Sequence, residues 1–129
     1  MPEIVALLHV SMLVGNIDRA RAFYEGVLGL VPSPSRPYMA FPGVWYNVGS
    51  GQIHLICKAG SAQPAGWPEH GGRDRHAAFG VRNWLQLTDI LDVRGVPYTL
   101  SRSGRDALFV SDPDGNVLEL MSVESQARP

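Results

Sequence analysis

The sequence predicts an α+β fold made of two βαβββ modules, related by an approximate twofold, whose mixed sheets form a concave cup. The chain has 129 residues, of which 45% are hydrophobic, as in one compact domain. Two segments of helical period each follow an apolar strand-like run. Landmarks also recur at a nearly fixed offset: His9 and Asn16 are followed 67 residues later by His76 and Asn83.

The first module opens with a strand predicted over Ile4–Val14. Alternation along this strand places His9 and Ser11 on the same face. Asn16 is the expected N-cap of the helix that follows, and Gly29 is expected to end that helix in a left-handed conformation.

A proline-rich stretch and a hairpin complete this module. Residues 31–42 contain four prolines and are expected to hold at most a short, irregular edge strand. Val44–Val48 and Gln52–Cys57 are predicted to pair across the turn at 49–51. His54 interrupts the second of these strands.

A connector rich in Gly, Pro and Ala spans residues 58–74 and has neither helical nor strand period. It divides the single domain, residues 1–129, into modules at about 4–57 and 75–121. His70 falls within the connector and is expected to be a loop residue.

The second module repeats the order of the first. Arg75–Val81 is predicted as a strand that carries His76 on a face of small residues. Asn83 is the expected N-cap of an amphipathic helix that Gly95 ends. Three further strands are predicted, at residues 96–101, 106–111 and 116–121.

Glu119 stands in the middle of the last strand, which follows a turn containing Pro113 and Gly115. A carboxylate in such an apolar strand is unfavourable unless a partner compensates its charge. Glu119 lies 65 residues after His54, so the two occupy equivalent positions in the repeat.

Four side chains are therefore expected to converge on the face that the helices do not cover: His9, His54, His76 and Glu119. Three imidazoles and a carboxylate suit one divalent ion per site, namely Fe, Ni, Co, Zn or Mn. Taken singly, each histidine is also explained as a hydrogen-bonded core residue, and Glu119 as half of a buried ion pair. Their common face and repeated positions favour a shared metal site.

Substrate-binding residues are predicted around this site. Ser11 shares the face of His9, and Trp45 and Tyr46 belong to the hairpin, where aromatic rings suit an apolar pocket. Arg105 precedes the last hairpin and is a candidate for holding an anionic group.

Composition limits the partners. The net charge is −1 and no basic cluster is present, which gives no basis for binding nucleic acid or an anionic membrane. No run reaches the roughly 20 apolar residues of a membrane span. A small-molecule substrate and a cytoplasmic location are expected, and the single cysteine, Cys57, agrees with a reducing compartment.

The paired modules, the helix end Ala22–Leu30 and the segment Phe109–Leu120 resemble the vicinal oxygen chelate superfamily. This superfamily includes glyoxalase I, extradiol dioxygenases, fosfomycin-resistance proteins, methylmalonyl-CoA epimerase and bleomycin-binding proteins. The resemblance implies metal ligation by residues at the positions of His9, His76 and Glu119. His54 stands at a position that is a ligand in glyoxalase I, where the residue is commonly glutamate.

The resemblance also implies that two neighbouring substrate oxygens chelate the metal, with His54 or Glu119 as the catalytic base. The expected function is a metal-dependent lyase or isomerase of glyoxalase type. An Fe(II)-dependent dioxygenase and a metal-free drug-binding resistance protein are the alternatives. The resemblance further implies a homodimer, with the site formed within one chain or across two.

Overall fold

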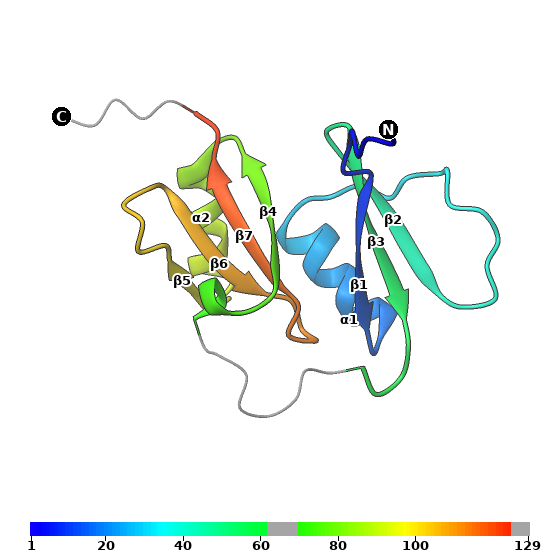
Figure 1. Cartoon of the computed structure of the whole chain (residues 1–129). Coiled ribbons are helices and arrows are strands. Elements are labelled where there is room, and N and C mark those ends of the chain that lie inside the picture. The colour runs from blue at the N-terminus through cyan, green and yellow to red at the C-terminus, as the bar shows by residue number, and fades with distance from the viewer. Residues whose placement is uncertain (62–69, 125–129) are drawn as a thin grey trace. The chain divides into compact units, whose positions relative to one another are not determined.

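The computed structural model describes residues 1–61 and 70–124, apart from the side chain of Arg73. The chain forms two compact units, residues 1–61 and 62–129, each with its own sheet (Figure 1). Both sheets are mixed and each is accompanied by helix, which confirms the α+β class. The middle of the predicted connector, residues 62–69, lies outside the described residues. A short 3-10 turn, η2 (Gly71–Arg73), follows it.

The sheet of unit 1 contains β1 (His9–Val14), β2 (Gly43–Val48) and β3 (Gly51–Cys57) in the order β1-β3-β2. β1 is parallel to β3, and β2 and β3 form the predicted antiparallel hairpin. The proline-rich stretch contributes only an isolated bridge between Pro32 and Tyr46. This bridge stands where the βαβββ order calls for another strand, as the prolines led us to expect.

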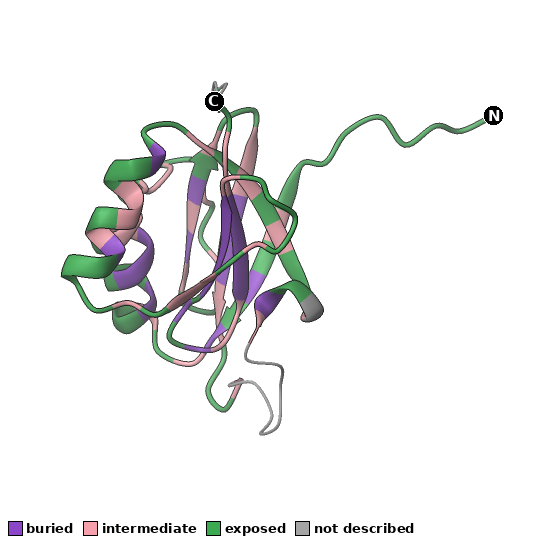
Figure 2. Ribbon diagram, turned by 90° about the vertical axis from the view of Figure 1, so that its left-hand side faces the viewer, coloured by how far each residue is buried: buried purple, intermediate pink, exposed green. Residues whose placement is uncertain are grey.

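β1 is shorter than predicted, because it begins at His9 and not at Ile4. Its ladder with β3 starts where His9 faces Gln52, and β3 itself starts at Gly51. One further backbone bond joins the Gln52 amide to the Leu8 carbonyl. The apolar residues before it have no β3 residues to pair with, so the segment leaves the unit as an exposed trace (Figure 2).

The first helix begins as predicted and then widens. The Asn16 side chain caps α1 (Ile17–Arg21) by accepting a hydrogen bond from the Arg19 amide at 2.9 Å. The chain continues as a π-helical segment, η1 (Ala22–Val27), which the sequence pattern did not reveal. Gly29 follows with φ of 73°, the left-handed conformation expected of it.

Unit 2 has the complete βαβββ order (Figure 1). α2 (Trp84–Val93) follows the first of its four strands, which are β4 (His76–Val81), β5 (Tyr98–Leu100), β6 (Ala107–Ser111) and β7 (Val117–Ser122). The sheet order is β4-β7-β6-β5, with β4 parallel to β7 and the other pairs antiparallel. β5 is shorter than the predicted strand at 96–101.

Asn83 does not cap α2 with its side chain, contrary to prediction. It has φ of 57°, and its backbone N–H donates to the Glu124 carboxylate at 2.6 Å. Asparagine is one of the few residues that adopt the left-handed region readily. Asn83 therefore turns the chain into the helix through its backbone.

The two sheets share a register that relates the predicted site residues. In unit 1, Ser11 of β1 faces His54 of β3. In unit 2, Ala78 of β4 faces Glu119 of β7. His9 thus stands two residues before Ser11, which pairs with His54. His76 likewise stands two residues before Ala78, which pairs with Glu119. This correspondence supports the internal repeat that the sequence predicted.

The core of each unit lies on its central strands, β3 in unit 1 and β6 and β7 in unit 2, and Figure 2 shows buried strand residues in the interior. In β7, Leu118 and Leu120 are buried together with Val117 and Glu119, so both faces of this strand are covered. The turn before β7 is fixed by Asp112, whose carboxylate accepts from the backbone amides of Asp114 and Asn116. None of the helices in the described part of the chain has the length and hydropathy of a membrane span.

Candidate metal and substrate site

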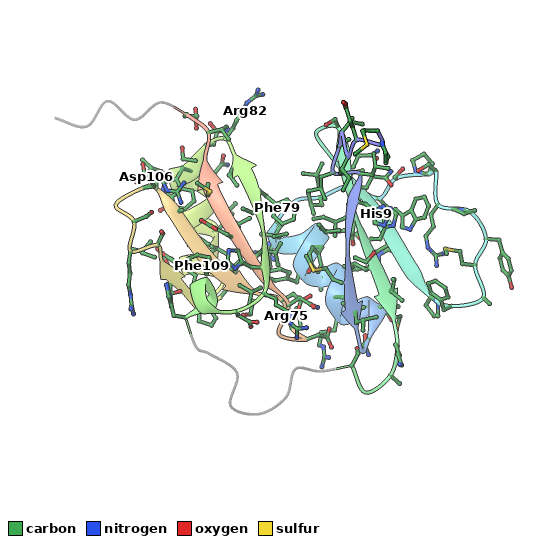
Figure 3. The ribbon with its side chains drawn as sticks, viewed as in Figure 1. His9, Arg75, Phe79, Arg82, Asp106 and Phe109 are labelled. Carbon is green, nitrogen blue, oxygen red and sulfur yellow. The ribbon has the colours of Figure 1, made fainter. Side chains whose placement is uncertain are left out.

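Three rings stack on one face of the unit 1 sheet. His9 of β1 and His54 of β3 have centroids 3.9 Å apart and planes inclined by 14°. Trp45, directly across from His54 on β2, covers the other side of the His54 ring at 4.0 Å and 2°. His54 is only 8% exposed between them, whereas His9, which is labelled in Figure 3, is exposed.

The His54 ring also has a polar partner on its own strand. Its Nε2 lies 2.8 Å from Gln52 Oε1. The Gln52 amide nitrogen in turn donates to Asn47 Oδ1 at 2.9 Å and lies 3.4 Å from Ser35 Oγ. Burial lowers the pKa of His54, and the nearby His9 and Arg36 lower this pKa further. His54 is therefore a neutral imidazole near pH 7.

His76 and Glu119 form the corresponding pair in unit 2. His76 Nε2 lies 3.2 Å from Glu119 Oε1, and Glu119 is 8% exposed. The other ring nitrogen, Nδ1, lies 2.8 Å from the Asp74 carbonyl oxygen. A carbonyl only accepts, so Nδ1 carries a proton and Nε2 is the atom directed at the carboxylate.

This geometry fits a divalent ion. His76 Nε2 and Glu119 Oε1 lie 3.2 Å apart, a separation that suits an imidazole–carboxylate ion pair and equally suits two atoms bound to one cation. Two donors bound to one zinc-like ion lie about 3.0–3.4 Å apart, from bond lengths near 2.1 Å. A histidine ligand that donates its other N–H to a backbone carbonyl is the usual supporting arrangement. His76 and Glu119 are therefore suitable ligands.

The structure brings the four predicted ligands together as two pairs, His9 with His54 and His76 with Glu119. Each pair belongs to one unit. Within either unit, the residues that the structure describes contain no cluster of three or more His, Cys, Asp or Glu side chains arranged for a metal. Each unit thus supplies half of the predicted set.

Arg105 stands beside the pair in unit 2. Its Nη2 lies 4.0 Å from Glu119 Oε2, and its Nε donates to Ser103 Oγ at 3.1 Å. The side chain is 62% exposed, so this ion pair is screened by water and contributes little to stability. The guanidinium remains available to an anion near Glu119.

His70 is a site neighbour that the sequence did not reveal. Its Nδ1 lies 2.7 Å from Thr99 Oγ1, and its ring meets Phe109 edge-on at 5.1 Å. Phe109, which is labelled in Figure 3, also contacts His76, at 5.0 Å between ring centroids, and pairs with Glu119 across the strands. Because His70 lies outside any strand or helix period, no spacing could have placed it there.

The remaining predicted substrate residues differ in position. Ser11 is exposed on β1, and Trp45 is stacked on His54. Tyr46 is fully buried on the opposite face of β2, where it stacks on Tyr24. Alternation along the strand separates Trp45 from Tyr46, so the substrate-binding role predicted for Tyr46 does not fit its position.

Tyr46 has a structural role instead, and its removal should measure that role. Its hydroxyl donates to Glu25 Oε2 at 2.8 Å, and burial together with this bond raises its pKa. Tyr46→Phe is expected to lower the free energy of unfolding in urea by about 1–3 kcal/mol. Tyr98→Phe, which removes an exposed bond to Asp92, should cost less than about 0.5 kcal/mol. Equal losses, or a changed KM in Tyr46→Phe, would contradict this assignment.

Comparison with known proteins extends over nearly the whole chain. The family model of the Glyoxalase/Bleomycin resistance protein/Dioxygenase superfamily matches residues 6–120. Glyoxylase I 4 of Arabidopsis thaliana is 30% identical over 132 residues, covering 95% of this chain and 74% of that protein. Lactoylglutathione lyase of Haemophilus influenzae is 28% identical over 130 residues, covering 92% of this chain and 93% of that protein.

Solved structures agree with this result. A glyoxalase family protein from Bacillus anthracis superposes with a TM-score of 0.77 at 25% identity, covering 96% of this chain and 99% of that one. A variant of the fosfomycin resistance protein FosX from Listeria monocytogenes, complexed with Mn(II) and 1S,2S-dihydroxypropylphosphonic acid, gives 0.68 at 17% identity, covering 93% of each chain. The second likeness concerns the fold alone. From the family match and the curated relatives together, the chain belongs to the Glyoxalase/Bleomycin resistance protein/Dioxygenase superfamily.

Proposed function

We propose that this protein is a divalent-metal-dependent enzyme of glyoxalase type, a lyase or isomerase acting on a small molecule with two adjacent oxygens. The observation that carries the proposal is the His76–Glu119 pair, in which a buried carboxylate and the Nε2 of an Nδ1-protonated imidazole lie 3.2 Å apart. The relatives named Glyoxylase I 4 and lactoylglutathione lyase support the same class.

His9, His76 and Glu119 would supply three ligand atoms. His9 is included because it has the register position of His76 in the other sheet. His54 is the fourth side chain of the set, with coordination or proton transfer open to it. The pairs can meet within one chain or across a homodimer, and the proposal holds for either arrangement.

The bound ion would supply Lewis-acid stabilisation of negative charge on the substrate oxygens. The protein's own residues would do the rest. His54, neutral near pH 7, can accept a proton from a carbon next to a carbonyl. Trp45 offers an apolar surface, Arg105 an anion contact near Glu119, and Ser11 a hydroxyl on the face of His9.

An Fe(II)-dependent dioxygenase is the second candidate. Two histidines and one carboxylate also form the ligand set of non-haem Fe(II) oxygenases, and His9, His76 and Glu119 are of these types. A glyoxalase should turn over a hemithioacetal with Ni, Co or Zn in the absence of oxygen. A dioxygenase should instead consume oxygen with a catechol after anaerobic loading with Fe(II).

These two assays test the proposal when His76→Ala is measured beside the wild type. Hemithioacetal turnover that needs added metal and disappears in the variant is the expected result. Oxygen consumption with a catechol would move the assignment to the dioxygenase. Binding of a drug-like ligand that neither metal removal nor His76→Ala alters would point to a metal-free resistance protein and contradict the proposal.

A further inference from the structure

The stacked pair in unit 1 differs from the pair in unit 2 in a way that bears on coordination. An imidazole binds a metal through a lone pair that lies in the plane of its ring, at about 2.0–2.1 Å. The His9 and His54 planes are inclined by only 14° with centroids 3.9 Å apart. An ion bound by both rings would have to lie on the line where the two ring planes intersect, and for planes so nearly parallel this line is much farther from either ring than a metal–nitrogen bond length. In this stack, the two rings therefore cannot bind the same ion.

Binding of His9 and His54 to one ion would require one ring to turn, and the contacts of the two rings are unequal. His54 lies between His9 and Trp45, with its plane only 2° from that of Trp45. It is 8% exposed and its Nε2 is held by Gln52. His9 is exposed and stacks at the outer end. His9 is thus the ring with room to turn towards a ligand position.

The ring nitrogens of His54 and His76 are fixed in opposite ways. In His76, the Nδ1–H donates a hydrogen bond to the Asp74 carbonyl oxygen. Nε2 is therefore the nitrogen that faces the carboxylate and could bind an ion. In His54 it is Nε2 that meets Gln52 Oε1. The Gln52 amide nitrogen faces two oxygens, Asn47 Oδ1 and Ser35 Oγ, so the amide oxygen is directed at His54. An oxygen at that point accepts and requires an Nε2–H.

We propose that Gln52 is a positioning residue, which holds His54 as an Nε2-protonated imidazole and thereby keeps Nε2 from the metal. His9, His76 and Glu119 are then the ligands, and His54 keeps its lone pair on Nδ1 for proton transfer. The inference about the metal rests on the proposed function, whereas the inference about the tautomer concerns unit 1 alone. Asn47 contributes by orienting the Gln52 amide.

The test is the nitrogen-15 NMR spectrum of the imidazoles in the full, metal-free chain, with His54 assigned by the loss of its signals in His54→Gln. The wild type should show a protonated Nε2 and an unprotonated Nδ1. Gln52→Leu removes the acceptor and should shift both signals towards an average of the two tautomers. Gln52→Glu retains an acceptor and should restore the wild-type pattern. Ser35→Ala, which removes the 3.4 Å contact to Gln52 together with a hydrogen bond to Ser33, should leave the wild-type pattern unchanged.

Two results would overturn the positioning role: an Nδ1-protonated His54 in the wild type, or a Gln52→Leu spectrum identical to that of the wild type. A merely structural role of Gln52 would not give rescue by Gln52→Glu, because that rescue depends on the acceptor oxygen. These measurements need no metal. They decide the role of Gln52 even if the proposed function fails.

Titration with Zn²⁺ then tests coordination. The signals of His9 and His76 should change to metal-bound values while His54 keeps its Nε2 proton. Zn²⁺ affinity, measured by calorimetry, should fall by more than about 100-fold in His9→Gln and stay within about threefold in His54→Gln. Loss of the Nε2 proton of His54 on adding Zn²⁺ would overturn its exclusion from the ligand set. If Zn²⁺ changes none of the histidine nitrogen signals, the proposed function is wrong. The inference that His54 is not a ligand is then wrong as well.

Discussion

Replacing His76 by alanine is expected to lower the affinity for Zn²⁺, Ni²⁺ or Co²⁺ by more than about 100-fold. This exceeds the usual effect of removing a residue that only hydrogen-bonds to a metal ligand. The reason is that His76 Nε2 is the imidazole nitrogen directed at the buried carboxylate of Glu119. Metal-dependent turnover should disappear with the metal. Isothermal titration calorimetry of the metal-stripped protein measures the first effect.

His70→Ala is the matched control for this experiment. His70 belongs to the same unit and contacts the same Phe109 ring, but its Nδ1 is bonded to Thr99. Its loss should leave metal affinity within a few-fold of the wild type. Equal losses in the two variants would show that affinity depends on packing around Phe109 and not on ligation by His76.

Glu119→Gln should abolish metal-induced stabilisation without destabilising the metal-free protein. The carboxylate is 8% exposed in a strand buried on both faces, where a charge is unfavourable unless compensated. Glutamine keeps the shape and removes the charge, so the free energy of unfolding of the metal-free form should change by less than about 1 kcal/mol. At 100 times the dissociation constant, metal should add about 2.7 kcal/mol to the wild type and nothing to the variant.

Leu118→Ala, on the same strand, is the control that should lower stability without affecting stabilisation by metal. Leu118 is 1% exposed and faces away from Glu119, so its truncation should cost about 2–5 kcal/mol while the metal increment persists. Urea unfolding with and without metal measures both effects. A Glu119→Gln protein as unstable as Leu118→Ala would identify Glu119 as a structural residue and not a ligand.

Much of the fold followed from local pattern, because alternation and caps are properties of short segments. The faces of β1, β3 and β4 and the cap at Asn16 were predicted correctly. The start of β1 was predicted wrongly. The apolar residues before His9 have the pattern of a strand, but β3 is too short to pair with them. The prediction that the Asn83 side chain caps α2 was wrong. The left-handed backbone of Asn83 and the hydrogen bond from its N–H to Glu124 depend on tertiary context.

The residues of the candidate site were chosen from their positions in the repeat, whereas the contacts between them required the structure. Positions within the internal repeat are enough to relate His54 to Glu119 and His9 to His76. Stacking of Trp45 on His54 and the acceptance of the Nε2 proton by Gln52 depend on side-chain conformation, which spacing does not encode. His70 reaches the Phe109 ring from a segment without period, so its place follows only from the tertiary fold.

Elemental analysis of the purified protein, with the metal-to-chain ratio determined in parallel for Glu119→Gln, shows whether Glu119 and His76 form a metal centre. We expect close to one divalent ion per chain in the wild type, and nickel, cobalt, zinc or manganese would favour the glyoxalase-type reaction over the iron-dependent one. The variant should retain less than a tenth of the wild-type content, an order-of-magnitude loss expected for removal of a ligand. A wild type that stays metal-free after incubation with each of these ions, or a variant that retains the full ratio, would contradict a metal centre at this pair.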